Sequence, residues 1–315
     1  MSADEVDRLE ALREDYARGR IGRDEFWQRM RDRHCALRDY SGLLCGGDVA
    51  EIAMTADGLT VRLASGLRFR WNPENLREPV SVAVNHGFYE AAAERILERC
   101  AREAALIVDA GANIGWYAVR LSAAAGRAAR VVAFEPVPDT AAALEANIAL
   151  NGFGDRVRIV RAGLSDAPGD ATIYLPEATG HVGASLQDLH PDEASRTVRI
   201  PLTTLDREFG GDAAGRIGLI KCDVEGAELL VLRGGQAVIA RDRPILFLEL
   251  LRKWSARFDY RPDDVIAWAA RLGYDCFAVG EGGLRRCTAV DDATVETNYL
   301  FLQPDRDRRL AEELA

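Results

Sequence analysis

Short apolar runs alternate with segments of helical spacing over the last two thirds of the chain. The runs are too short for helices and are typical of strands that are buried on both faces of a sheet. These strands are expected at residues 106–109, 130–134, 157–160, 218–223, 245–249, 276–279 and 299–302. Helices are expected near residues 115–125, 138–151, 226–240 and 262–272. Seven strands, most of them parallel and joined by crossover helices, predict an α/β fold with a doubly wound, Rossmann-like sheet.

The N-terminal region begins with two expected amphipathic helices. Apolar side chains recur at helical spacing over residues 3–39, and the pattern breaks between Gly19 and Gly22. Both helices carry many charges of both signs. They are interpreted as an arm that supports a homodimer, as a lid, or as a solvated hairpin that packs on the body of the protein.

A period of two replaces the helical period at residues 49–71. Asp-Gly and Ser-Gly pairs supply two turns, so this segment predicts a three-stranded β-meander. A further strand is expected at residues 80–84. We therefore expect two parts, which are an N-terminal extension of helices and meander over residues 1–84 and the main α/β domain over residues 85–315.

Composition and charge narrow the class of protein. Of the 315 residues, 48% are hydrophobic and 29% are charged, which is typical of a water-soluble protein. The net charge of −10 argues against nucleic acid as a partner, because binding phosphates requires basic surfaces. Six cysteines without a C-x-x-C pair predict free thiols in a reducing cytoplasm. The charged N-terminus is unlike a signal peptide, and no apolar run approaches the length of a membrane span.

Residues 105–115 read ALIVDAGANIG and are followed by an apolar run at helical spacing. A strand, a glycine-rich turn and a helix form the first half of a nucleotide-binding α/β unit. A dinucleotide fingerprint requires glycines where this chain has Asn113 and Trp116, which disfavours a dehydrogenase. Asp109 would repel a phosphate group and favours a ligand with positive charge. S-adenosylmethionine fits this requirement, because it has a sulfonium, an amino group and a ribose but no phosphate.

Polar residues stand where the other expected strands end, and ligands of such sheets bind beyond the carboxyl ends of the strands. The two oxygens of Glu135 could accept hydrogen bonds from both hydroxyls of a ribose. Ser165 follows the third strand, in a loop that can meet the adenine. Asp223 ends the fourth strand, next to Lys221, a buried cation that needs a partner. Glu249 ends the fifth strand and could orient an acceptor hydroxyl, take its proton or pair with Lys221.

Further segments carry candidate acceptor-binding residues. Residues 170–206 interrupt the α/β rhythm and form an insertion over the ligand edge, in which His181 could contact the acceptor or act as a base. The segment NHGFYE places His86, Tyr89 and Glu90 beside a glycine. A binding site and a helix cap with a buried ring are equally compatible with that pattern. Glu225 opens the helix after the fourth strand, where acids are also favoured by the helix dipole.

Several motifs occur in the order that is found in one known family: VDAGANIG, FEP, NIALN, LTTLD, IKCDVEGAE and FLEL. Through these motifs, residues 85–250 resemble the FkbM family of S-adenosylmethionine-dependent methyltransferases. The resemblance implies a class I methyltransferase fold and methylation of oxygen on sugars, polyketides or other secondary metabolites. It implies that the methionine end of the cofactor is held by Asp109, Gly111, Asn113 and Gly115. It also implies that Glu135 binds the ribose and that Asp223 and Glu225 lie beside the methyl group.

The expected function is therefore transfer of a methyl group from S-adenosylmethionine to a hydroxyl of a small-molecule acceptor in secondary metabolism. Asp223, Glu249 and His86 are the candidates for the base that accepts the hydroxyl proton, and the sequence does not rank them. No pattern indicates a required metal, although Asp223, Glu225 and Glu249 could recruit Mg²⁺. Methylation of a nitrogen and a non-catalytic nucleoside-binding module are the alternatives.

Overall fold

The computed structural model describes residues 9–44, 46–176, 182–189, 191–192, 194–211, 215–291 and 293–315. Its main sheet has the strand order β13-β12-β14-β11-β10-β4-β5-β6. The strands are β4 (Leu106–Ala110), β5 (Arg130–Phe134), β6 (Val157–Val160), β10 (Leu219–Cys222), β11 (Ile245–Glu249), β12 (Asp275–Gly280), β13 (Gly283–Arg286) and β14 (Asn298–Leu302). Five neighbouring strands of the sheet are parallel to one another: β6, β5, β4, β10 and β11. The strand β14 runs antiparallel to both of its neighbours, β11 and β12. The expected, mostly parallel α/β sheet is confirmed.

Helices cover both faces of this sheet. The side chains of Ile107 and Val131 lie on the face of the sheet that is covered by α4 (Ala91–Ala101), α5 (Trp116–Ala124) and α6 (Pro138–Leu150). The side chains of Val108 and Val132, the next residues along each strand, lie on the opposite face. That face bears α7 (Leu205–Phe209), α8 (Glu228–Gly234), α9 (Gln236–Asp242) and α11 (Pro262–Arg271). This alternation follows from the period of two in a strand and explains why the strands are apolar throughout.

Three details of the main domain differ from the expectation. The sheet has eight strands rather than seven, because the polar segment β13 pairs with β12 in an edge hairpin. Residues 80–84 belong to the helix α3 (Pro79–His86) rather than to a strand. Proline at the first helical position favours this start, and Val80, Ala83 and Val84 are buried on one helical face. The helix expected at residues 226–240 is divided into α8 and α9 at Gly235.

The predicted meander is confirmed as β1 (Val49–Thr55), β2 (Gly58–Leu63) and β3 (Arg68–Trp71). It shares a core with the main domain, since Phe69 packs on Trp116 with ring centroids 4.6 Å apart. Asn147 of α6 also accepts a hydrogen bond from the backbone N–H of Arg70 at 2.8 Å. The proposed boundary between residues 84 and 85 falls inside α3.

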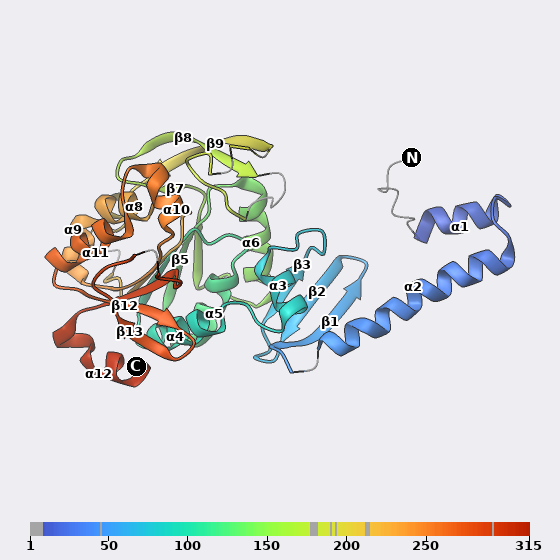
Figure 1. Ribbon diagram of the computed structural model, residues 1–315, viewed down its shortest axis with the longest axis horizontal. Coiled ribbons are helices and arrows are strands. Elements are labelled where there is room, and N and C mark those ends of the chain that lie inside the picture. Colours follow the sequence, from blue (N-terminus) through green and yellow to red (C-terminus); the bar gives the residue numbers. More distant parts are fainter. Residues whose placement is uncertain are drawn as a thin grey trace.

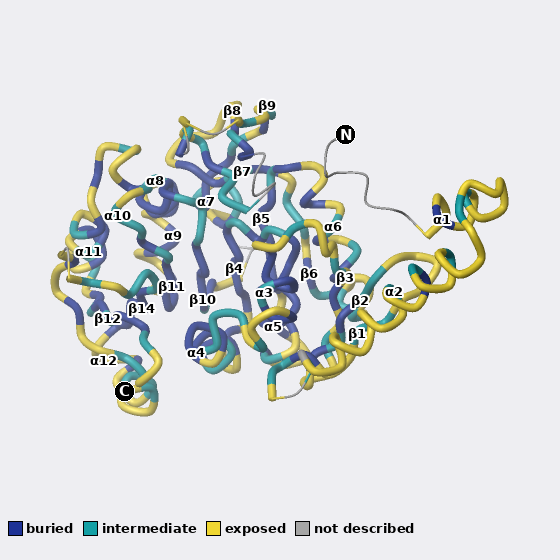
Figure 2. Tube along the Cα trace, turned by 45° about the vertical axis from the view of Figure 1, so that its right-hand side comes forward, coloured by how far each residue is buried: buried dark blue, intermediate teal, exposed yellow. Residues whose placement is uncertain are grey.

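The N-terminal arm consists of α1 (Leu9–Ala17) and α2 (Arg23–Leu43), which project from the body as a helical hairpin (Figure 1). Tyr16 stacks on Phe26 where the two helices meet, with ring centroids 4.5 Å apart. Most of the arm is exposed, in contrast to the buried strands of the main sheet (Figure 2). Dimerisation through this arm stays a prediction.

A small second sheet lies over one end of the main sheet, above the carboxyl ends of its parallel strands (Figure 1). It consists of β7 (Gly163–Leu164), β8 (Gly169–Pro176) and β9 (Ser195–Thr203) in the order β7-β9-β8. Ile173, Leu175 and Ile200 of this sheet pack against Val137, which precedes α6. The remaining short elements are α10 (Arg252–Ser255), a 3₁₀ turn at Ala256–Phe258 and α12 (Pro304–Leu314). In the described part of the chain, no helix combines the length and the apolar character needed to cross a bilayer.

Candidate functional site

The glycine-rich turn after β4 packs closely against the ends of the two neighbouring strands, β5 and β10. The N–H groups of Gly111 and Ala112 both donate to the carbonyl of Phe134, at 3.1 and 3.0 Å. Gly111 has a φ of 74°, and a Cβ at this position would lie 1.9 Å from the carbonyl oxygen of Asp223. Only glycine fits this conformation and this close approach. Gly115 has a φ of 90° and packs tightly on Leu144. The turn therefore exposes backbone at the carboxyl edge of the sheet.

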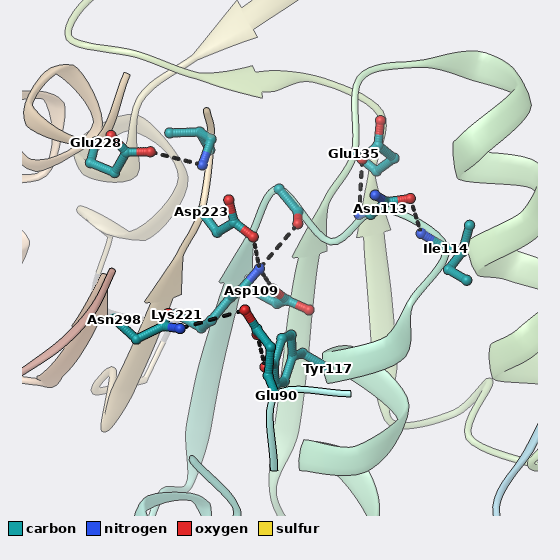
Figure 3. Close-up of polar contacts among 12 residues, drawn as sticks. Glu90, Asp109, Asn113, Ile114, Tyr117, Glu135, Lys221, Asp223, Glu228 and Asn298 are labelled. Carbon is teal, nitrogen blue, oxygen red and sulfur yellow. Dashed lines mark hydrogen bonds and ion pairs between the residues drawn. The ribbon is translucent and has the colours of Figure 1, made fainter. Parts of the chain in front are cut away.

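Glu135 is held in one orientation at the end of β5. One carboxylate oxygen accepts a hydrogen bond from the backbone N–H of Asn113 at 3.0 Å (Figure 3), and the other accepts one from the backbone N–H of Val137 at 2.9 Å. The residue is only 6% exposed, yet it lines a cavity. A carboxylate has about four acceptor positions, so two backbone donors leave capacity for a ligand.

The first cavity, which we call the nucleoside cleft, lies between the main sheet and the small second sheet. It encloses about 670 Å³ of space, part of which is open to solvent. Its walls are mostly apolar. It is lined by Gly111, Asn113, Phe134, Glu135, Pro136, Gly163, Leu164, Ile173, Gly183, Ala184, Leu186, Ile200, Asp223, Val224, Glu225 and Ala227.

The second cavity adjoins the first, and we call it the acid chamber. It is lined by Arg77, Pro79, Tyr89, Asn113, Val182, Gly183, Asp223, Glu225, Glu249, Leu251 and Trp254. Four of these residues also line the nucleoside cleft: Asn113, Gly183, Asp223 and Glu225. A molecule bound in one cavity can therefore meet a molecule bound in the other, and Asp223 stands where they meet.

Lys221 lies beneath this junction and neutralises part of its charge. Its ammonium is 3.3 Å from a carboxylate oxygen of Asp223 and 3.7 Å from one of Asp109 (Figure 3). It also donates to the carbonyl of Gly111 at 3.3 Å. Burial alone would lower the pKa of Lys221, but the attraction of Asp223 and Asp109 holds it above its usual value. The lysine therefore remains a cation inside the protein.

A second set of polar side chains surrounds Glu90, which opens α4 with a positive φ of 36°. The hydroxyl of Tyr117 donates to one oxygen of Glu90 at 2.5 Å, and the side-chain amide of Asn298 lies 3.5 Å from the other (Figure 3). Burial raises the pKa of Glu90, and the hydrogen bond from Tyr117 opposes this shift. Lys221 lies 5.1 Å from the ring centroid of Tyr117, so both polar sets belong to one network.

Two acids of the chamber, Glu225 and Glu249, have raised pKa values. Burial, followed by the charges of Asp223 and Glu228, raises the pKa of Glu225 to about 8. Burial and the neighbouring carboxylate of Asp223 also raise the pKa of Glu249 well above its usual value. Glu228 accepts the backbone N–H groups of Val224 and Gly226, both at 3.1 Å, and thereby fixes the loop that carries Glu225. Carboxyls with raised pKa values in a cavity are typical of functional sites.

The family model described as the methyltransferase FkbM domain matches residues 109–276, which is more than half of the chain. The chain belongs to the FkbM methyltransferase family. Residues 109–276 therefore form a methyltransferase FkbM domain, and the sheet confirms the class I methyltransferase fold that the resemblance implied. The polar side chains beyond β4, β5 and β10 lie at the sheet edge where ligands of such folds bind.

Known proteins match parts of this FkbM methyltransferase. It is 30% identical over 229 residues to the AMB antimetabolite synthetase AmbE of Pseudomonas aeruginosa, covering 56% of this chain and 10% of that protein. It is 31% identical over 159 residues to methyltransferase sdnD of Sordaria araneosa, covering 41% of this chain and 59% of that protein. The chain thus spans less than two thirds of the length of these relatives. The crystal structure of methyltransferase FkbM from Methylobacillus flagellatus has a TM-score of 0.39 and 18% identity, over 62% of this chain and 43% of that chain.

Seven of the predicted site residues of the FkbM methyltransferase line the two cavities: Tyr89, Gly111, Asn113, Glu135, Asp223, Glu225 and Glu249. Their assembly follows from topology, because parallel strands bring their carboxyl ends to one edge. Sequence reasoning did not select Tyr117, Asn298 or Trp254. Glu90 was noted in the segment NHGFYE beside His86 and Tyr89, but no role was assigned to it.

The other predicted site residues lie elsewhere. Asp109 is completely buried beneath Lys221 and lines neither cavity. Ser165 is 5% exposed and packs against Gly234, away from both linings. His86 is exposed at the end of α3, because Gly87 ends the helix there in a left-handed conformation. The predicted contacts of these residues with cofactor or acceptor stay predictions. His181 lies outside the described residues.

Proposed function

We propose that this methyltransferase methylates a hydroxyl oxygen of a small-molecule acceptor bound in the acid chamber. The observation that supports the proposal is the junction of two cavities at Asp223, one mostly apolar and one acidic. S-adenosylmethionine supplies a methyl group on a positively charged sulfur, which an oxygen nucleophile can displace. The chain supplies binding, alignment and exclusion of water for this reaction.

The nucleoside cleft fits the nucleoside of S-adenosylmethionine. Glu135, which is fixed by two backbone donors and lines the cleft, offers a carboxylate that can accept hydrogen bonds from the ribose hydroxyls. The apolar side chains of Leu164, Ile173 and Ile200 offer surfaces for the adenine. The backbone around Gly111 leaves no room for a side chain and borders the same cleft. These features favour an uncharged base and a ribose rather than a phosphate group.

Asp223 is the residue best placed to accept the proton of the acceptor hydroxyl. It lines both cavities, and its side chain is 30% exposed. In the transfer, the hydroxyl oxygen forms a bond with the methyl carbon while the carbon–sulfur bond breaks and its electron pair stays on sulfur. The hydroxyl proton passes to Asp223, and Lys221 holds that carboxylate in place at 3.3 Å. Glu249 also lines the chamber, and burial and the charge of Asp223 raise its pKa, so it holds a proton more readily than an ordinary carboxyl.

Oxygen is favoured over nitrogen because of the charge in the chamber. An amine must lose its proton before it can attack a methyl group. Neighbouring carboxylates raise the pKa of an amine and keep it protonated, so they oppose methylation of that nitrogen. A hydroxyl is uncharged at neutral pH, and a nearby base that accepts its proton makes its oxygen a better nucleophile. The acids Asp223, Glu225 and Glu249 therefore favour O-methylation.

Calorimetric titration with S-adenosylhomocysteine tests the cofactor site. Glu135→Gln keeps the size of the side chain but removes its charge and one acceptor oxygen. The substitution is expected to weaken binding roughly 10- to 100-fold, because hydrogen bonds to a charged group contribute about 1.5–3 kcal/mol. Glu145→Gln is the matched control, since Glu145 lies on the surface of α6 and pairs with exposed Arg161. Equal affinity of the Glu135→Gln and Glu145→Gln proteins would remove Glu135 from the site.

A further inference from the structure

Three acidic side chains, Asp223, Glu225 and Glu249, and one basic side chain, Arg77, line the acid chamber. Resting on the O-methylation proposed above, we propose that the acceptor is an amino alcohol, a molecule that bears a protonated amine near the hydroxyl that is methylated. The ammonium binds among the acids of the chamber, and the hydroxyl faces Asp223. Amino sugars and cyclic amino alcohols belong to this class.

The balance of charges carries the proposal. Tyr89, which lines the chamber, has four acidic neighbours: Glu90, Asp223, Glu225 and Glu249. Asp109 adds a buried fifth acid behind them. Among the described residues, the nearby cations are Lys221, which pairs with Asp223, the exposed Arg77 of the lining, and Lys253, whose ammonium lies over the ring of Trp254. S-adenosylmethionine adds a net charge of only about one at neutral pH, from its sulfonium, amine and carboxylate. An acceptor with a positive charge would stabilise the ionised forms of Glu225 and Glu249.

The chamber can release protons when a cation enters. Burial and the charge of Asp223 raise the pKa values of Glu225 and Glu249, so these carboxyls hold protons more strongly than ordinary carboxyls do. A nearby ammonium favours their ionised forms. Binding of a cation therefore promotes release of a proton from these carboxyls and formation of an ion pair in the cavity. A neutral acceptor gains nothing from these carboxyls beyond ordinary hydrogen bonds.

Aromatic rings complete the lining. Trp254 and Tyr89 both face the chamber, and ring faces attract cations. The ring of Trp254 already holds a cation in this way, because the ammonium of Lys253 lies 4.4 Å from its centroid. Tyr89 is fixed by an edge-to-face contact with Trp116 at 5.7 Å. Carboxylates and fixed aromatic rings in one cavity are the features that recognise a substituted ammonium group.

The experiment uses the full chain saturated with S-adenosylhomocysteine in a buffer that contains EDTA. Calorimetry compares amine probes with neutral twins: D-glucosamine with N-acetyl-D-glucosamine and D-glucose, and 2-aminocyclohexanol with cyclohexane-1,2-diol. We expect at least one amine to bind about tenfold more tightly than its twins, as desolvated ion pairs and cation–π contacts allow. Glu225→Gln and Glu249→Gln should each reduce this preference. Glu281→Gln, a change on the exposed β12–β13 turn, should leave it intact.

Each other result counts against the amino alcohol. Equal binding of amine and neutral twin, binding of neutral probes alone, or no binding of any amine would overturn the proposal. A preference for amines that survives both Gln substitutions would also overturn it, because the chamber would not be its cause. Binding that appears only after EDTA is replaced by Mg²⁺ would do the same and would indicate a metal. The prior titration with S-adenosylhomocysteine reports on the cofactor site separately, so the two proposals can fail independently.

Discussion

Replacing Lys221 with Met is expected to lower the free energy of unfolding by about 3–5 kcal/mol, the cost typical of breaking a buried ion pair by removing one partner. Met has a similar volume, so packing changes little. Asp109 is completely buried and would lose the cation that offsets its charge, while Asp223 would lose a contact of 3.3 Å. Urea unfolding monitored by circular dichroism measures the effect. The loss should shrink at acidic pH, because protonation of Asp109 removes the uncompensated charge.

The chain provides a matched control for this substitution, because Lys221 and Lys253 are the two lysines in its sequence. Lys253 is exposed and makes one cation–π contact, with Trp254. Lys253→Met should therefore cost about 0.5–1 kcal/mol, the value typical of an exposed contact of this kind. Similar losses in the two Met proteins would show that Lys221 does not compensate the buried acids.

Asp223→Asn is expected to lower the rate of methyl transfer roughly 10²–10⁴-fold, the range typical of losing a general base. Asn keeps the shape of the side chain and can still contact Lys221, but it does not accept the hydroxyl proton. The affinity for S-adenosylhomocysteine should be unchanged within error, because Glu135 and the apolar walls of the nucleoside cleft remain. Turnover is measured as release of S-adenosylhomocysteine, with the first acceptor that a panel of amino alcohols and neutral alcohols provides.

The control for the catalytic prediction is Asp170→Asn on β8, where Asp170 makes an exposed ion pair with Arg199 at 3.4 Å. This protein should turn over at the rate of the unmodified enzyme. A rate for Asp223→Asn that equals the control rate would exclude Asp223 as the base. Loss of S-adenosylhomocysteine binding in Asp223→Asn would instead assign the residue to the cofactor.

The main sheet could be predicted from the sequence because each of its central strands is a short apolar run. Val108 and Val132, like their neighbours, are apolar since both faces of the sheet are covered. The edge strand β13 has no such signal, because it is polar and depends on pairing with β12. The run at residues 80–84 is apolar but short, and a run of that length does not distinguish a strand from a buried helix.

Sequence reasoning predicted the site residues that the order of the strands alone brings together. Glu135, Asp223 and Glu249 end parallel strands, and such ends meet at one edge of a sheet. The contact between Glu90 and Asn298 spans 208 positions of sequence and arises from tertiary packing, which a local pattern does not reveal. His86 was chosen because histidine is a common base, but the exposure that keeps it outside the cavity linings depends on how α3 ends.

A crystal structure with bound S-adenosylhomocysteine is the most direct test of how the two cavities divide the reaction. The account predicts that the ribose hydroxyls contact the carboxylate of Glu135 and that the sulfur faces Asp223 at the entrance of the acid chamber. A ligand whose ribose lies away from Glu135, whose sulfur faces away from the chamber, or that leaves the nucleoside cleft empty at saturating concentration would contradict it.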